Sequence, residues 1–188
     1  MKIIIFILMA AMLGSCTEKD MDARILSVPI KREKEVAVIL SEAQTMIVDK
    51  GSARLDNINI ACGEIDGTHL KSGEEFSFNK ILGKRTEAKG YKVAPVMVDG
   101  EHSEGIGGGI CQVSSTVYMA AAAAGLEITE RTPHSKPVGY APGGDDATVV
   151  YGVKDLKFLN STMSEIVIYC NADENAVKVK ITAVLKCY

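Results

Sequence analysis

Tryptophan is absent from this sequence of 188 residues, and aromatic residues make up only 5% of it. A flat stacking platform for nucleic-acid bases or sugar rings is therefore not expected. The net charge is only −3, and no run of basic residues extends beyond Lys31-Arg32. Because nucleic-acid binding requires a basic surface, the composition excludes nucleic acid as a partner.

Metal-binding patterns are also missing. The sequence has no pair of cysteines spaced as CxxC, and His69, His102 and His134 fit no zinc-ligand spacing. We therefore expect no metal and no cofactor.

Cysteine is sparse, and its spacing argues against a dense disulfide framework. Cys62 falls on one face of a predicted helix and is expected to be a buried core thiol. Cys170 and Cys187 fall on the last predicted hairpin, whose turn lies near residues 173–175. At about 3.3 Å per strand residue, the two thiols are too far apart to bridge unless a bulge or crossover intervenes.

The first sixteen residues have the pattern of an export signal. Lys2 precedes an apolar run at 3–12, which is too short to span a bilayer. The run ends in Leu13-Gly14-Ser15-Cys16, followed by polar residues. Small residues before a cysteine at this place resemble the lipobox of bacterial lipoproteins, which implies cleavage before Cys16 and a lipid on it. The alternative is an ordinary signal peptide with an incidental cysteine.

These features predict three parts: a lipoprotein signal peptide at 1–15, a polar tether at 16–32 and a single domain at 33–188. Acyl chains on Cys16 would hold the protein at a membrane surface, because each buried CH₂ contributes about 0.8 kcal/mol. We expect an extracytoplasmic, lipid-anchored protein. No feature of the sequence specifies an oligomeric state.

Two helices are predicted near the start of the domain. Apolar residues at three- and four-residue steps in 33–49 favour an amphipathic helix, with Gly51 as its C-cap. A second short helix is predicted at 53–65. The segment 112–124 is alanine-rich and apolar almost all round, which indicates a helix buried on most of its surface.

Short apolar stretches separated by turn residues predict strands elsewhere. They lie at 76–78, 92–98, 126–131, 138–140, 147–151, 156–159, 165–170 and 176–185. The order of helices, strands, one central helix and further strands favours an α+β fold, with the central helix packed on mainly antiparallel strands.

Cys111 is the strongest candidate for a reactive residue. It follows the glycine loop 105–109 and lies at or just before the first turn of the central helix. The partial positive charge at a helix N-terminus favours a thiolate. The unpaired N–H groups of that turn, including that of Gln112, can donate to an oxyanion. Gly108 and Gly109 would let a substrate backbone approach closely.

His134 and an acidic pair later in the chain are candidate partners of this thiol. The order Cys111, His134 and then Asp146 or Asp145 resembles that of papain-like cysteine hydrolases. In that arrangement His134 would be general base and acid, and one aspartate would orient it. Alternatively, the glycine loop is mere geometry or an anion site, Cys111 and His134 pack or brace loops, and the aspartates form a turn.

Several segments together resemble the VanW family. They read LKSGEEFSFN (70–79), GKRT (83–86), GY (90–91), GGGICQVSSTVY (107–118), HS (134–135) and DATV (146–149). The resemblance spans residues from about 54 to the C-terminus. It implies a bacterial envelope protein, and the namesake of the family is an accessory member of a vancomycin-resistance gene set.

The resemblance also directs attention to a set of polar residues on the family motifs. They are Asn79, Arg85, Thr86, Gln112, Ser114, Ser115 and His134. Ser114 and Ser115 lie on the helical face of Cys111, where one serine can bond back to a carbonyl and the other can pack. Arg85 either pairs with Asp146 as a buried strut or binds a substrate carboxylate.

Three functions remain open at this point. The first is a cysteine-dependent hydrolase or acyltransferase that acts on peptidoglycan or its peptides through Cys111, His134 and Asp146. The second is a non-catalytic module that binds peptidoglycan or a partner protein. The third is a redox role for Cys111, which requires a nearby thiol such as Cys62.

Overall fold

The computed structural model describes residues 34–98 and 101–187. The predicted signal peptide and the whole of the predicted tether, including Cys16, lie outside the described residues. The helices are α2 (Ser52–Ile65), α3 (Phe78–Leu82) and α4 (Ile110–Ala123), with a 3-10 turn η1 (Glu87–Lys89). The strands are β1 (Lys34–Met46), β2 (Thr68–Leu70), β3 (Glu75–Ser77), β4 (Val93–Val98), β5 (Glu101–Ile106), β6 (Glu127–Glu130), β7 (Lys157–Leu159), β8 (Glu165–Ala172) and β9 (Ala176–Cys187).

The strands form three sheets, and every pairing between the named strands is antiparallel. The largest sheet has the order β1-β9-β8-β2, a second has the order β3-β7-β6, and β4 and β5 form a separate hairpin. The turn at Asp173 joins β8 to β9, as predicted. The α+β class is therefore confirmed.

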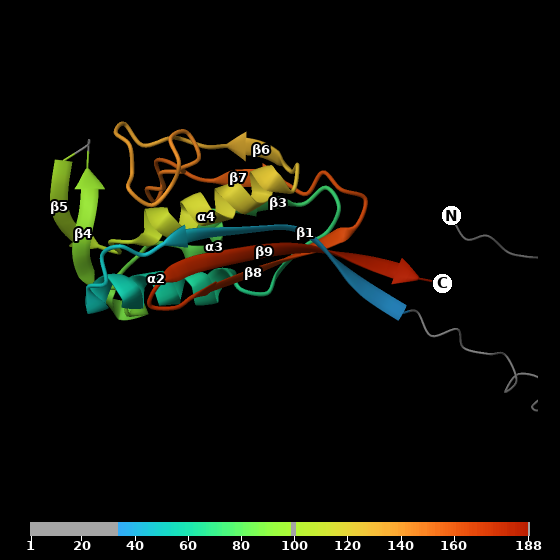
Figure 1. The fold of residues 1–188 in the computed structure, drawn as a ribbon, viewed down its shortest axis with the longest axis horizontal. Coiled ribbons are helices and arrows are strands. Elements are labelled where there is room, and N and C mark those ends of the chain that lie inside the picture. Colours follow the sequence, from blue (N-terminus) through green and yellow to red (C-terminus); the bar gives the residue numbers. More distant parts are fainter. Residues whose placement is uncertain (1–33, 99–100, 188) are drawn as a thin grey trace, which may run out of the picture. The chain divides into compact units, whose positions relative to one another are not determined.

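Helix α4 lies between the four-stranded sheet and the β3-β7-β6 sheet (Figure 1). Its side chains Val113, Val117, Ala120 and Ala121 are fully buried. A helix that is apolar on nearly every face finds partners on both sides in this position. The sequence-based prediction of a buried central helix is confirmed, with its start two residues earlier than expected.

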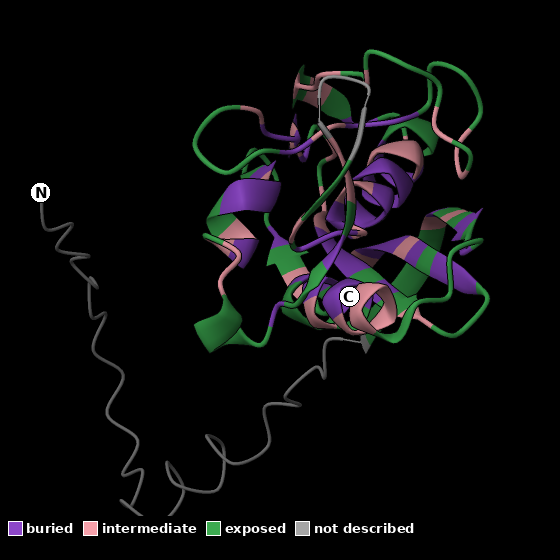
Figure 2. Ribbon diagram, turned by 90° about the vertical axis from the view of Figure 1, so that its left-hand side faces the viewer, coloured by how far each residue is buried: buried purple, intermediate pink, exposed green. Residues whose placement is uncertain are grey.

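The core continues from α4 into both sheets. Phe76 of β3 stacks on Phe158 of β7, with ring centroids 4.5 Å apart. Ile166 and Ile168 of β8 and Ile181 of β9 are fully buried on the other side. Buried residues gather in the interior of the domain, and the loops around it are largely exposed (Figure 2). This packing fixes α4, and α4 in turn fixes the position of Cys111.

The prediction of a helix at 33–49 is wrong, because this segment is strand β1. The register of β1 on β9 shifts between Ile39 and Ser41. Such a bulge reverses which face the following side chains occupy. The alternation of apolar residues therefore changes phase within the strand and imitates a helical spacing.

The inward-facing side chains of β1 also make it hard to recognise as a strand from the sequence. Ser41 and Thr45 face the core although they are polar, and they bond Ala120 O and Thr116 Oγ1 of α4 at 2.7 Å each. Gly51, predicted to end the first helix, instead precedes α2 as its N-cap residue.

Other predictions differ in smaller ways. The helix at 53–65 is confirmed as α2. The segment 138–140 is a loop and not a strand, and the part of the supposed glycine loop up to Ile106 belongs to β5. Residues 147–149 are extended without belonging to a named strand. This extended segment forms one wall of the site described next.

Candidate active site

Cys111 is the second residue of α4, and only Ile110 separates it from three consecutive glycines. Gly107 and Gly109 have φ of +88° and +105°, which disfavour any side chain. A Cβ on Gly108 would lie 2.5 Å from Pro95 O. The close approach that glycine allows at 108 is therefore used by the protein's own strand β4, and not by a substrate as the sequence suggested.

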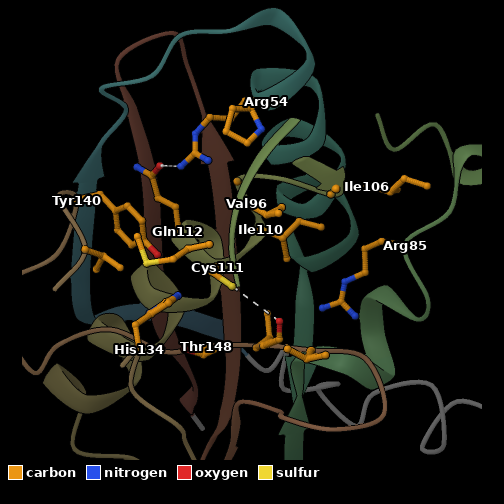
Figure 3. A pocket seen from close by; sticks show the side chains of 18 of the residues that line it. Arg54, Arg85, Val96, Ile106, Ile110, Cys111, Gln112, His134, Tyr140 and Thr148 are labelled. Atoms are coloured by element: carbon orange, nitrogen blue, oxygen red, sulfur yellow. Dashed lines mark hydrogen bonds between the residues drawn. The ribbon is translucent and has the colours of Figure 1, made fainter. Parts of the chain in front are cut away.

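His134 and Asp146 form a tight pair beside this cysteine. The Asp146 carboxylate accepts hydrogen bonds from the backbone N–H of His134 at 2.6 Å and from its Nδ1 at 2.5 Å. Both side chains are more than nine-tenths buried. Because the carboxylate holds Nδ1, the other ring nitrogen is left free, and the His134 ring lies beside Cys111 (Figure 3).

Arg131 holds Asp146 from the other side. Its Nε donates to Asp146 O at 2.8 Å, and its Nη2 lies 3.6 Å from Asp146 Oδ1. Asp145 is exposed, and its N–H bonds Pro142 O within a turn. Of the two adjacent aspartates, Asp146 is therefore the one placed to orient His134. The contribution of Arg131 was not anticipated from the sequence.

The protonation equilibria of the pair are linked. Burial by itself lowers the pKa of His134, but hydrogen bonds with Cys111 and Asp146 and the charges of both groups raise its pKa above the usual value. Burial by itself raises the pKa of Asp146, but the two hydrogen bonds from His134 outweigh burial and lower that pKa. The site therefore favours an imidazolium next to a carboxylate.

The extended segment 146–150 runs along the first turn of α4. Cys111 Sγ lies 3.8 Å from Val149 O. Ser115 Oγ accepts from Ala147 N–H at 2.9 Å and donates to Cys111 O at 2.7 Å. Ser114 Oγ donates to Ala147 O at 2.6 Å and to Cys111 O at 3.1 Å. Both serines are fully buried and join the helix to the segment, so neither is placed to contact a substrate.

The backbone N–H and the side chain of Gln112 also form hydrogen bonds within the protein. Its N–H donates to Gly109 O at 3.0 Å, and its side chain is 1% exposed. The side-chain oxygen accepts from Arg54 Nη2 at 3.0 Å, and the side-chain nitrogen donates to Met46 O at 3.0 Å. The predicted donation from the Gln112 N–H to an oxyanion does not fit this arrangement.

Arg85 lies on the opposite side of Cys111 from His134 (Figure 3), and it meets Asn79 there through a hydrogen bond. Arg85 Nη1 donates to Asn79 Oδ1 at 2.7 Å and to Gly83 O at 3.0 Å. Since Arg131 is the arginine that approaches Asp146, the suggested strut between Arg85 and Asp146 is not formed.

A cavity of about 820 Å³ opens above Cys111. Its walls are largely apolar and come from the β4–β5 hairpin, the start of α4, the loop around Tyr140 and the segment after Ala147. The polar and charged side chains that line it are Asp49, Arg54, Lys84, Arg85, Cys111, Gln112, His134, Tyr140, Thr148 and Tyr151. This size suits a short peptide or a similar small ligand.

Tyr140 is a pocket residue that sequence reasoning missed. Its ring meets the His134 ring edge-on at 6.5 Å between centroids. Burial and the nearby Cys111 raise the pKa of Tyr140, so its hydroxyl is neutral at physiological pH. A tyrosine in a glycine- and proline-containing loop carries no periodic signal, and only the tertiary structure brings it to the site.

The redox alternative for Cys111 has no support in the described thiols. Cys62 of α2 is buried and hydrogen-bonds with Cys170 of β8. That bond and burial raise the pKa of Cys170. Both thiols are therefore core groups, as predicted for Cys62. Within residues 34–98 and 101–187, no cluster of three or more His, Cys, Asp and Glu side chains is arranged to hold a metal ion.

The site therefore consists of the Cys111 thiol at the start of α4, the His134 imidazole and the buried Asp146 carboxylate. Beside them lies a largely apolar cavity whose lining includes Arg54, Lys84 and Arg85. Residues 53–182 match the family model described as VanW like protein, and the chain belongs to this family. Over 129 residues it is 45% identical to the uncharacterized protein YoaR of Bacillus subtilis (strain 168), a match covering 69% of this chain and 43% of YoaR.

A second relative is vancomycin B-type resistance protein VanW of Enterococcus faecalis (strain ATCC 700802 / V583). It is 28% identical over 126 residues, which cover 64% of this chain and 46% of that protein. The match thus spans less than half the length of either relative. No solved structure matches the chain with statistical significance.

None of the helices in the described part of the chain is both long and apolar enough to cross a membrane.

Proposed function

We propose that this VanW-family protein is an extracytoplasmic lipoprotein and a cysteine-dependent hydrolase or acyltransferase that acts on an amide bond of peptidoglycan or its peptides. The observation that carries the proposal is the Cys111–His134–Asp146 chain, in which Cys111 lies beside the His134 ring (Figure 3) and His134 Nδ1 bonds Asp146 Oδ2 at 2.5 Å. Such a chain is what nucleophilic catalysis by cysteine needs.

The proposed reaction proceeds through a thioester. Cys111 transfers its proton to His134, and its sulfur attacks the carbonyl carbon of the amide. As the new C–S bond forms, the C–N bond breaks, and His134 returns the proton to the leaving amine. Water or a second amine then attacks the thioester and gives its proton to His134, which releases the product and restores the thiol.

Asp146 serves this cycle by holding one tautomer of His134. With Nδ1–H donated to the carboxylate, only Nε2 is free to exchange a proton with sulfur or substrate. The raised pKa of His134 favours the imidazolium that must form when the thiol gives up its proton. Burial of the pair inside the cavity wall keeps these interactions out of bulk water.

The proposed extracytoplasmic location rests on the N-terminal sequence. The apolar run at 3–12 and the lipobox-like segment before Cys16 support export and lipidation. A protein held by a lipid at the outer face of a membrane meets cell-wall peptide as its most abundant amide polymer. The relative VanW of Enterococcus faecalis is named as a vancomycin resistance protein.

A non-catalytic peptidoglycan- or partner-binding module is the second candidate. It is favoured by the 3.8 Å contact of Cys111 Sγ with Val149 O, because a thiol that donates to a backbone carbonyl can serve packing alone.

Mass spectrometry of the intact protein separates the two functions. The protein is incubated with wall peptides released by muramidase, and an adduct with the mass of an acyl group is sought on Cys111. We expect it in the unchanged protein and in Asp145→Asn, but not in Cys111→Ala, and at a much lower level in Asp146→Asn. If the peptides bind yet leave no adduct and no cleaved product, the binding module is correct and the catalytic proposal fails.

A further inference from the structure

Among the described residues, Arg85 forms no ion pair with a carboxylate; the charge of Asp155, which accepts from Asn79 N–H, acts on it without such a pair. The hydrogen bonds of Arg85 go from Nη1 to Asn79 Oδ1 and Gly83 O, which are neutral acceptors. Its guanidinium also lies over the Phe78 ring, with Cζ 5.7 Å from the centroid. A partly buried arginine in a protein usually pairs with a carboxylate or a phosphate, so this arrangement leaves room for an external anion.

One donor of this guanidinium has no partner at all. Nη2 of Arg85 is buried and makes no hydrogen bond. Burial lowers the pKa of Arg85, which reflects the cost of keeping the cation out of water. Because Arg85 also lines the cavity above Cys111, an acceptor that arrives with a ligand would relieve this cost.

The position of Arg85 relative to the reacting groups follows from the extended segment 146–150. At its first residue, Asp146 holds His134. Three residues further, Val149 O contacts Cys111 Sγ. Cys111 therefore lies nearer the Val150 end of the segment, and His134 lies at the Asp146 end.

Asn79 connects Arg85 to the Val150 end of the segment. Val150 O accepts a hydrogen bond from Asn79 Nδ2 at 3.3 Å, and Asn79 Oδ1 accepts from Arg85 Nη1. In the close view, His134 and Arg85 lie on opposite sides of Cys111, and the guanidinium of Arg85 points towards the cysteine (Figure 3). The order across the cavity is therefore imidazole, thiol, guanidinium.

This order assigns the two parts of a substrate. The amine that leaves must accept its proton from His134, so it lies on the His134 side of the sulfur. The acyl part then extends towards Arg85. We infer that Arg85 binds a free carboxylate on the acyl part of the substrate, so that the protein selects acyl donors with an acidic side group. This inference rests on the proposed function and specifies the substrate of the same site.

A carboxylate fits better than a phosphate. The cavity walls are largely apolar, and Arg85 offers one unpartnered buried donor and one positive charge. A single negative charge balances this one guanidinium, whereas a phosphate would bring up to two charges and additional acceptors.

The test uses two synthetic wall-type peptides that differ only in one group. The acyl-donor residue carries a free carboxylate in one peptide and a carboxamide in the other. Acylation of Cys111 is followed by intact mass. We expect the unchanged protein to prefer the carboxylate by about tenfold or more, as for a charged hydrogen bond, and Arg85→Gln to lose this preference.

Lys84→Gln is the matched control. It removes a positive charge from the adjacent residue, which also lines the cavity but is exposed. The carboxylate preference should persist in this variant. Equal loss in Lys84→Gln and Arg85→Gln would show a general charge effect and overturn the assignment to Arg85. The same conclusion would follow if the unchanged protein accepted both peptides equally.

Two further measurements separate failure of this inference from failure of the proposed function. Binding of both peptides to Cys111→Ala, measured by calorimetry, reports carboxylate recognition without chemistry. A tenfold preference that disappears in the double variant with Arg85→Gln supports the inference even if no acylation occurs. If Arg85→Gln does not fold, Arg85→Lys replaces it, with an expected fall in preference of at least about threefold. An unchanged preference in that variant overturns the inference.

Discussion

The Asp146 carboxylate binds His134 at two points, through the backbone N–H at 2.6 Å and through Nδ1 at 2.5 Å. The first bond fixes the loop, and the second fixes the ring. Together they hold the imidazole against Cys111 without any contribution from the exposed neighbour Asp145. The reactivity of Cys111 should therefore depend on one aspartate of the pair and not on the other.

The first prediction concerns alkylation of Cys111 by iodoacetamide. Asp146→Asn should slow the reaction at neutral pH by about tenfold, because His134 loses its orienting carboxylate and the charge that favours the imidazolium. The rate is measured by peptide mapping, and the buried Cys62 and Cys170 provide unreacted internal references.

Asp145→Asn is the matched control for that experiment and should keep the rate of the unchanged protein. A rate that stays the same in Asp146→Asn and in His134→Ala would show that Cys111 reacts as an isolated thiol.

The second prediction concerns the pH dependence of stability. The pKa of His134 is raised in the folded protein, so its contribution is fully present below the unfolded pKa of about 6.5 and is lost as the pH rises through the folded pKa. The pKa of Asp146 is lowered, so its contribution is present above an unfolded pKa of about 3.9 and is lost as the pH falls through the folded pKa.

Both charges are therefore present between these limits. Asp146→Asn should lower the free energy of unfolding by more at about pH 5.5 than at about pH 9, with a difference of about 1 kcal/mol or more. Urea unfolding of both proteins at the two pH values measures it. An equal loss at both pH values would mean that the ion pair does not form.

The third prediction concerns the glycine loop. In Gly108→Ala the new methyl group would meet Pro95 O at 2.5 Å and Ala94 O at 2.7 Å, both of them backbone atoms. The loop or strand β4 must then move, and we expect a loss of about 1–3 kcal/mol in the free energy of unfolding.

Gly63→Ala is a suitable control, because a Cβ there meets nothing within 4 Å and the residue lies inside α2. It should raise the stability by about 0.5–1 kcal/mol. Thermal unfolding of the two variants side by side gives the comparison. The close packing of β4 on the loop would be disproved by equal stability of Gly108→Ala and the unchanged protein.

The fourth prediction concerns Ser115, whose hydroxyl accepts from the Ala147 N–H and donates to Cys111 O. Ser115→Ala leaves a buried N–H without its partner and should destabilise the fold by about 1–3 kcal/mol. Ser114→Ala should cost less, because Ser114 only donates to carbonyls, and one of these, Cys111 O, also accepts from Ser115. Equal losses in chemical denaturation would contradict this difference.

Much of the site could be anticipated from the sequence because it depends on local signals. Glycines before an apolar, alanine-rich segment place Cys111 at the start of a buried helix, and the structure has it there. The helix α2 was predicted for the same reason, since its apolar spacing is uninterrupted. Strand β1 was missed because its bulge near Leu40 and the polar inward residues Ser41 and Thr45 disguise the alternation.

The sequence by itself determined the family, the α+β class and the candidates Cys111, His134 and the adjacent Asp145 and Asp146, because helix starts, turns and motifs are set by neighbours along the chain. Only the tertiary structure showed that Asp146 is the aspartate that holds His134. The tertiary structure decided which polar groups remain available. In the folded protein, Ser114, Ser115 and the Gln112 side chain form internal hydrogen bonds. Arg131, and not Arg85, approaches Asp146, and Tyr140 lines the cavity. A polar group is available only if no buried neighbour satisfies it, and those neighbours come from strands and loops far away in the sequence.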